Sequence, residues 1–296
     1  MASQRVRALV DLSRTRQALL SVAQPALGAV LALGALPPGR VVAMGGAAAA
    51  CGYLAVFSLN DVLDRHVDQR ALAEGKAEFE GHDIDTAFVR HPLARGDLTL
   101  AFSWAWVAGL AIVAVVLGWL LNPLCVALFA ASVALEGVYC ALRSVSPLKT
   151  IVSGVMVAIG GLAGWVAVAP ISLKALSFFA FLVAWEIAGR NLPNDLADIA
   201  PDARVGIRTV ATVWGPRVSA EAIMAGTLAT AAAVVVMPET PLGKILGVIA
   251  VLWAMGLPAL GLIRRPTSEQ AGAFFNRASL LPVLLFGAAI ASVIGA

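Results

Sequence analysis

Two matching stretches of the chain gather the residue types best suited to chemistry. The first reads NDVLDRHVDQR over residues 60–70, and the second reads NDLADIAPDAR over residues 194–204. Each has the form N-D-x-x-D-x-x-x-D-x-R. Positions i, i+3 and i+7 of a helix lie on one face. We therefore expect each stretch to present its acids together, namely Asp61, Asp64 and Asp68 in the first and Asp195, Asp198 and Asp202 in the second.

Six carboxylates repel one another unless positive charge lies between them. Mg²⁺ takes oxygen ligands and is commonly held by carboxylates together with the phosphate oxygens of a substrate. The two motifs therefore predict a magnesium site that bridges to a diphosphate, with all six aspartates as metal ligands. Asn60 and Asn194 would add amide oxygens or hydrogen bonds. One motif alone is equally compatible with solvated acids at a helix end, and it is the second copy that favours the metal site.

The rest of the chain is apolar. Of its 296 residues 60% are hydrophobic and 13% are charged, and the mean hydropathy is +0.87. About 20 apolar residues cross a bilayer, and nine such segments can be drawn at 18–36, 41–59, 101–121, 123–140, 150–169, 173–191, 217–236, 242–263 and 278–295. The segments lack the alternation of a membrane β-barrel. We predict a single all-α membrane domain, residues 1–296, with nine transmembrane helices.

The basic residues predict the orientation in the bilayer. All of the 21 lysines and arginines except Arg40, Lys174 and Lys244 fall on the side of the N-terminus when the nine segments alternate across the membrane. By the positive-inside rule this places the N-terminus, and the ends of the membrane segments that carry both aspartate motifs, in the cytoplasm. No basic stripe with interleaved aromatic residues indicates a nucleic-acid partner.

The two motifs occupy equivalent places in the chain. They follow the second and the sixth apolar segments, and each opens a long polar connection, over residues 61–99 and 191–216. Such a correspondence predicts a weak internal duplication around an intramembrane cavity. Residues 1–17 are expected to form a cytoplasmic N-terminal segment, and residues 69–99 a long cytoplasmic loop.

Three further motifs accompany the aspartates in a fixed order: HPLARGDLT at 91–99, YCALR at 139–143 and GIRTVATVWG at 206–215. Together the five motifs resemble the UbiA superfamily of intramembrane prenyltransferases, over nearly the whole chain. The resemblance implies Mg²⁺-dependent transfer of a prenyl group from a polyprenyl diphosphate to a lipophilic acceptor within the membrane, expected to be aromatic. It also implies that the nine transmembrane helices surround a central cavity, and that Tyr139 and Arg143 contact the diphosphate.

These inferences define a set of candidate site residues. The expected catalytic residues are Asp61, Asp64, Asp195, Asp198 and Tyr139, and the expected diphosphate ligands are Asn60, Arg143, Asn191, Asn194, Lys149, Arg95 and Arg208. The basic members of this set are also open to interpretation as cytoplasmic flanking charges. Glu186 either pairs with Arg190 at i, i+4 to lower the cost of burial or orients the site. His66, His82 and His91 are expected to be solvated loop residues.

Two departures from the family leave the acceptor open. Gln24 stands where many members have a charged residue, and the connection after Asp68 is long and includes EGKAEFEGHDID. A quinone precursor, a porphyrin-type alcohol, a glycerol phosphate and a sugar phosphate all remain candidates. A terpene cyclase acting without an acceptor and a non-catalytic lipid carrier are the alternative functions. Residues 69–89 are interpreted either as a mobile cover over the diphosphate or as a passive insertion.

Overall fold

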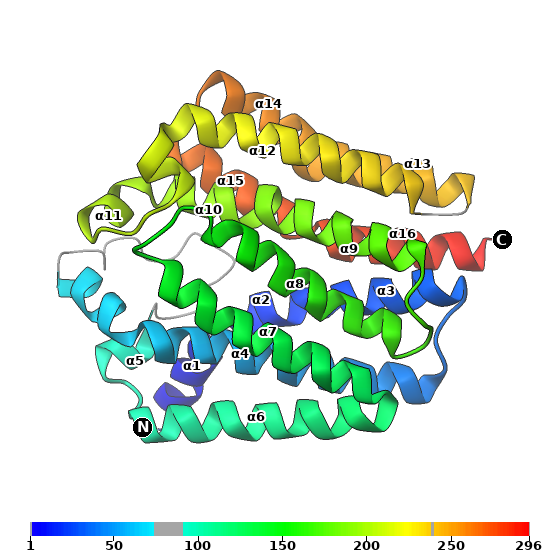
Figure 1. The fold of residues 1–296 in the computed structure, drawn as a ribbon, viewed down its shortest axis with the longest axis horizontal. Coiled ribbons are helices and arrows are strands. Elements are labelled where there is room, and N and C mark those ends of the chain that lie inside the picture. The colour runs from blue at the N-terminus through cyan, green and yellow to red at the C-terminus, as the bar shows by residue number, and fades with distance from the viewer. Residues whose placement is uncertain (1, 74–90, 238–239, 296) are drawn as a thin grey trace.

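Helices make up most of the computed structural model, which describes residues 2–73, 91–237 and 240–295 (Figure 1). No strand occurs in these ranges. Nine helical segments within them are long and apolar enough to cross a membrane: Thr15–Leu33, Gly39–Arg70, Leu100–Leu121, Pro123–Leu142, Lys149–Val166, Leu173–Ala197, Val210–Val236, Pro241–Arg264 and Ser268–Ile294. They overlap the nine predicted segments one for one, which confirms the all-α membrane fold. The chain is an integral membrane protein.

Four of the nine spans in the described residues are built from more than one helical element. The first contains α2 (Thr15–Ser21) and α3 (Ala23–Leu33), and the sixth contains α9 (Leu173–Trp185), the π-helix η2 (Glu186–Asn191) and α10 (Leu192–Ala197). The eighth joins α13 (Pro241–Val251), η3 (Leu252–Gly256) and α14 (Leu257–Arg264), and the ninth joins α15 (Ser268–Ala278) and α16 (Leu281–Ile294). A single element forms each of the others: α4 (Gly39–Ala73), α6 (Leu100–Leu121), α7 (Pro123–Leu142), α8 (Lys149–Val166) and α12 (Val210–Val236). Of these, α12 is kinked at Gly215, whose φ of 88° and ψ of 167° are not helical.

The spans form a closed ring. Each packs against the next along the chain, and α16 of the ninth contacts α3 of the first. Large apolar side chains such as Ile112, Leu173 and Leu228 are exposed on the outside, as expected where lipid is the solvent. The termini lie at opposite ends of the bundle (Figure 1), which agrees with an odd number of crossings.

Three short helices gather at the end of the bundle that carries the aspartate motifs: α1 (Ala2–Leu12), α5 (Pro92–Arg95) and α11 (Ile199–Arg204) (Figure 1). The expected N-terminal segment 1–17 is helical at residues 2–12 and 15–17, and Leu12 is fully buried in an apolar cluster with Leu59 of α4 and Leu93 of α5. The expected loop 69–99 is helical at residues 69–73 and 92–95. Residues 74–90, which include most of the predicted cover and His82, lie outside the described residues.

The two aspartate motifs have different backbones, although their spacing is the same. The first lies on the uninterrupted helix α4. In the second the helix breaks at Asp198, whose φ of −94° and ψ of 15° separate α10 from α11. The acids of the second motif therefore do not lie on one continuous helix, although Asp195, Asp198 and Asp202 all line the same cavity. Pro193 in the first turn of α10 lacks an amide hydrogen, and the widened turns of η2 directly precede it.

Candidate active site

A cavity of about 740 Å³ extends through the ring of spans. At one end it is lined by polar side chains of both aspartate motifs, including Asn60, Asp64, Asn194, Asp195 and Asp198. At the other end its walls are apolar and include Leu36, Pro37 and Leu121. The cavity therefore combines one strongly polar end with a long apolar interior.

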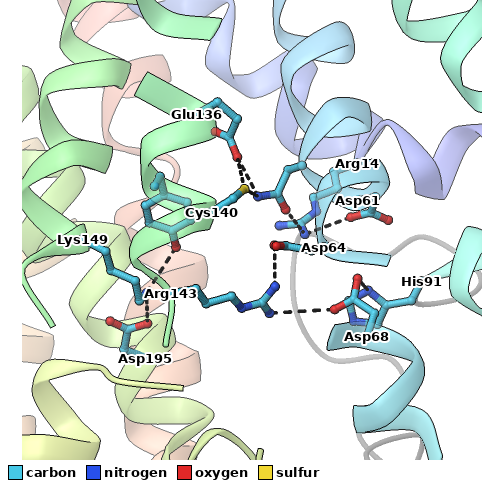
Figure 2. A network of polar contacts seen from close by, with 12 residues as sticks. Arg14, Asp61, Asp64, Asp68, His91, Glu136, Cys140, Arg143, Lys149 and Asp195 are labelled. Atoms are coloured by element: carbon cyan, nitrogen blue, oxygen red, sulfur yellow. Dashed lines mark hydrogen bonds and ion pairs between the residues drawn. The ribbon is translucent and has the colours of Figure 1, made fainter. Parts of the chain in front are cut away.

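Ion pairs connect the first motif to two arginines from other parts of the chain (Figure 2). Arg14 Nη2 lies 3.1 Å from both Asn60 Oδ1 and Asp61 Oδ1. Arg143, which follows α7, pairs with Asp64 and has Nη2 3.8 Å from Asp68 Oδ1. The first motif is thus neutralised by side chains that are far away in the sequence.

His91 adds a further contact to the same motif. Its Nδ1 lies 3.0 Å from Asp68 Oδ2, and its side chain is only 13% exposed. The expectation of a solvated His91 is therefore wrong, because α5 folds back onto α4 and brings the ring to the carboxylate. His66, by contrast, is exposed.

Arg14 and His91 also have unusual backbones. They are the two residues other than glycine with positive φ in the part of the chain that the structure describes, at 42° and 56°. Such conformations are uncommon and often occur at functional sites. No sequence pattern predicts that Arg14 pairs with Asp61 or that His91 pairs with Asp68.

The second motif is held by a lysine. Lys149 Nζ lies 3.1 Å from Asp195 Oδ1 and 3.3 Å from the Tyr139 hydroxyl oxygen (Figure 2). The lysine is 3% exposed and its ammonium also lies 4.9 Å from the centre of the Tyr139 ring. Asn60 Nδ2 donates to Glu136 Oε1 over 2.7 Å, so that Glu136 connects α7 to the first motif. Tyr139, also on α7, reaches the second motif indirectly, through Lys149 of α8.

Arg143 is a fixed positive charge between the two motifs. Burial lowers the pKa of its guanidinium, but the carboxylates of Asp64 and Asp68, with a smaller effect of Asp202, shift the pKa above its ordinary value. The backbone adds a link, because the Arg208 amide donates to the Arg143 carbonyl over 2.9 Å. The guanidinium therefore stays charged at the polar end of the cavity.

The donor set fits a hard divalent cation. Six carboxylates gather at this end, and Asp61, Asp68 and His91 bring ligand atoms within 4.8 Å of one another. Asp195 Oδ2 and Asn191 Oδ1 are buried and have no hydrogen-bond partner among the described residues. Buried oxygens of this kind are costly unless a ligand or ion completes them, and oxygen is the donor that Mg²⁺ prefers.

The structure brings most of the candidate residues together, but not all of them. Asn60, Asp64, Tyr139, Arg143, Lys149, Asn191, Asn194, Asp195, Asp198 and Asp202 line the cavity. Asp61 and Asp68 lie just behind this lining, on Arg14 and His91. Arg95 and Arg208 are exposed and are not among the lining residues. Arg190 Nε lies 3.7 Å from Glu186 Oε2, which agrees with the interpretation that these two residues form an i, i+4 ion pair.

Comparison with known proteins places this arrangement in context. A model of the UbiA prenyltransferase family matches residues 21–281. A search of curated proteins gives no match.

Among solved structures, a UbiA homologue from Aeropyrum pernix K1 in its apo form is similar, with a TM-score of 0.72, 18% identity, and 92% of this chain and 96% of that chain covered. A UbiA homologue from Archaeoglobus fulgidus bound to GPP and Mg²⁺ has a TM-score of 0.65 at 13% identity over 97% and 99% of the two chains. A digeranylgeranylglyceryl phosphate synthase has a TM-score of 0.65 at 14% identity over 99% of each. At these identities the likeness is one of fold.

Proposed function

The chain belongs to the UbiA prenyltransferase family, and from this premise we propose that it transfers a prenyl group from a polyprenyl diphosphate to a lipophilic acceptor within the membrane, with Mg²⁺ as cofactor. One observation carries the proposal: both aspartate motifs meet at the polar end of a single, otherwise apolar cavity. That shape matches a donor with a charged head and a long hydrocarbon chain. The Archaeoglobus homologue bound to GPP and Mg²⁺ supports the same donor and cofactor.

In this proposal the aspartates hold the metal and the basic residues hold the phosphate. The metal ligands are Asp61, Asp64, Asp68, Asp195, Asp198 and Asp202. Bound Mg²⁺ would supply positive charge for the leaving diphosphate. Arg143, Lys149 and the Tyr139 hydroxyl donate hydrogen bonds to phosphate oxygens, and a planar guanidinium suits such oxygens well. Asn60, Asn191 and Asn194 complete the polar end, with Arg95 and Arg208 as outer contacts.

The proposed function requires Arg143 and Lys149 to exchange their present carboxylate partners for phosphate oxygens, and the salt bridges of the structure support this. Arg143 and Lys149 are now paired with Asp64 and Asp195. With these carboxylates bound to a metal, Arg143 and Lys149 would be free to donate hydrogen bonds to the diphosphate. The net effect is that no charge is left unpaired in a buried site, where the cost would be several kcal/mol.

The apolar interior protects the reacting carbon. Departure of the diphosphate leaves an allylic cation, and aromatic rings lining the cavity, such as Tyr53, Phe57 and Phe129, tolerate positive charge through their π faces. The same walls keep out water, whose addition to the cation is the competing reaction. The acceptor then bonds to the first carbon of the prenyl chain.

Release of diphosphate from a prenyl donor by purified protein, with and without Mg²⁺, tests the proposal. We expect Mg²⁺-dependent release that Asp64→Ala and Asp198→Ala each lower by at least about 100-fold, the usual scale for loss of a group that stabilises transition-state charge. Near-normal turnover of either variant at saturating Mg²⁺ would contradict the metal assignment. A cyclised hydrocarbon formed without any acceptor would instead indicate a terpene cyclase.

The orientation is a second part of the proposal. The positive-inside distribution supports a cytoplasmic N-terminus and an active site on the cytoplasmic side. Single cysteines placed near residue 4 and near residue 295, in a chain in which Cys51, Cys125 and Cys140 are replaced by serine or alanine, should react with an impermeant thiol reagent from opposite sides. Labelling of both from one side would overturn the nine-span topology.

A further inference from the structure

A buried ion pair lies inside the membrane part of the cavity, away from the aspartates. Glu186 and Arg190 line the cavity and are 4% and 8% exposed. Ser153 of α8 donates its hydroxyl to Glu186 Oε1 over 3.2 Å. Charged side chains inside a span are costly, and they commonly serve a bound group. Their mutual attraction reduces that cost without explaining why either charge is present, and an apolar prenyl chain requires neither.

The cluster formed by Ser153, Glu186 and Arg190 adjoins the diphosphate end. Ser153 is one helical turn beyond Lys149 on α8, and Arg190 directly precedes Asn191. Glu186 comes nine residues before Asp195, which is about two helical turns along the span. A molecule held by this cluster would face the first carbons of a donor whose diphosphate lies at the aspartates.

The backbone that carries the acid and the arginine is firmly packed. A Cβ atom added at Gly154 of α8 would lie 2.8 Å from Ile187 Cγ1, and one at Gly226 of α12 would lie 2.4 Å from Ala188 Cβ. The two glycines thus let both neighbouring helices approach η2 closely. π-Helical turns are rare in proteins, but those that occur are often found at functional sites. A π-helix packed this closely on both sides is therefore consistent with a preformed subsite.

The surroundings of Arg190 are aromatic. Its guanidinium carbon lies 5.7 Å from the ring centres of both Trp185 and Phe275, and Phe275 lines the cavity. The guanidinium is therefore stabilised by π faces in addition to Glu186. The cluster carries one negative and one positive charge, so it has no surplus charge with which to neutralise a charged ligand.

We propose that Ser153, Glu186 and Arg190 form the acceptor subsite, and that the acceptor is an uncharged lipophilic molecule that bears a hydroxyl group. The inference rests on the prenyl transfer proposed above and assigns its second substrate. A hydroxyl group can donate to the carboxylate and accept from the guanidinium while both charges stay paired. An acceptor with its own carboxylate or phosphate would leave one charge uncompensated at a buried position inside the span.

Glu186 also has a chemical role in this assignment. The bond between the first prenyl carbon and the diphosphate oxygen breaks, and its electron pair leaves with the diphosphate. The acceptor's hydroxyl oxygen, or the ring carbon beside it in a phenol, bonds to that carbon. The acceptor loses one proton in this step, and the Glu186 carboxylate takes it as general base. Water removes the proton after the product has left.

The test uses purified full-length protein, Mg²⁺ and geranylgeranyl diphosphate. Three matched acceptors with the same free phenol are compared: an alkylphenol, the same alkylphenol with a ring carboxylate, and the same alkylphenol with a phosphate group at the end of its alkyl chain. We expect prenylation of the alkylphenol at least about tenfold faster than of either anion, which corresponds to about 1.4 kcal/mol. Glu186→Gln should lower kcat by about 100-fold or more, the usual range for a general base, and leave donor binding unchanged.

Glu221→Gln is the matched control. Glu221 forms an i, i+4 pair with Arg217 at 3.1 Å, but its side chain is 57% exposed on α12 and lies outside the cavity lining. This variant should behave as wild type. If Glu186→Gln fails to fold, Ser153→Ala removes only the hydroxyl and should lower the rate with the alkylphenol without affecting donor affinity.

The outcomes separate this inference from the proposed function. Preference for the anionic acceptors, normal kcat in Glu186→Gln, or diphosphate release without any prenylated acceptor would each overturn the subsite while leaving the donor site intact. Absence of donor binding by the wild type would instead overturn the prenyl transfer itself.

Discussion

Lys149 forms a buried ion pair with Asp195 at the polar end of the cavity. At 3% exposure its ammonium is removed from water and depends on Asp195 and on the Tyr139 ring. Removing one partner of a buried pair leaves the other charge uncompensated, at a cost of about 3–5 kcal/mol. The position is thus both structural and, in the proposed function, a phosphate ligand.

Lys149→Met is expected to lower the free energy of unfolding by about 3–5 kcal/mol, because Asp195 then remains buried without its cation. Lys149→Met combined with Asp195→Asn should recover most of that loss, since no unpaired charge remains. Thermal unfolding of the detergent-solubilised variants without Mg²⁺ measures both. A double variant as unstable as the single one would mean that the pair is not coupled.

Arg14 competes with metal for the first motif, because it lies 3.1 Å from Asp61 Oδ1. Arg14→Ala removes the cation that neutralises Asp61 in the absence of metal. We expect a lower melting temperature without Mg²⁺ and a larger rise on its addition than in wild type, because a ligand stabilises the state that it binds. Arg16→Ala, at an exposed position of α2, is the control. Equal Mg²⁺-induced shifts in all three proteins would contradict a metal at Asp61.

At the scale of the element, the second motif depends on a broken helix. The sixth span changes from α-helix to π-helix at Glu186, returns to α-helix before Pro193 and ends at Asp198. The following segment is then fixed by local structure. Thr209 caps α12 through a reciprocal box with Thr212, and Gly206 at φ 73° turns the chain so that the Ile207 amide reaches the Asp202 carbonyl at 2.9 Å.

Gly226→Ala tests whether the packing of η2 positions the site. The added methyl group would meet Ala188 Cβ at 2.4 Å, and neither partner has a flexible side chain that could move away. Overpacking of this kind costs about 1–3 kcal/mol and shifts the backbone. We expect lower thermal stability together with a reduced rate of transfer.

Gly137→Ala on α7 is the matched control for this change. A Cβ atom there meets nothing within 4 Å, so the substitution should be neutral or slightly stabilising through helix propensity. A Gly226→Ala variant with wild-type stability and rate would show that η2 adapts freely. Loss of stability without loss of rate would restrict its role to packing.

At the scale of the whole molecule, the ring of spans creates a cavity that extends far from the charged end. The helix α4 lines it from Asp64 back to Val42, with Ala49 on the same wall. Ala49 is 15 residues from Asp64, or about 22 Å along the helix. A long prenyl chain must pass this level, whereas a short one ends before it.

Ala49→Phe should therefore distinguish donors by chain length. We expect nearly unchanged turnover with geranyl diphosphate and a fall of at least about tenfold with octaprenyl diphosphate, since each CH₂ kept from its apolar site forfeits about 0.8 kcal/mol. Ala47→Phe is the control, because Ala47 is exposed and outside the cavity lining. Equal effects on both donors in Ala49→Phe would mean that the chain leaves the cavity nearer the diphosphate.

The sequence by itself determined the elements and the chemical character of the site. Nine apolar segments have one stable form in lipid, the helix, because every backbone group must be hydrogen-bonded within the span. The paired aspartate motifs are local patterns, so their spacing alone indicated a metal and diphosphate site. Tyr139, Arg143 and Lys149, which line the cavity with those motifs, were likewise identifiable from the chain.

Only the tertiary structure decided which residues neutralise those acids. Arg14, His91 and Lys149 lie 47, 23 and 46 residues from Asp61, Asp68 and Asp195, and their pairing depends on how α2, α5 and α8 pack against other helices. The break at Asp198 was equally unreadable, because the two motifs share one spacing while their backbones differ. Local patterns record spacing along a helix, whereas contacts between spans are set by the closing of the ring.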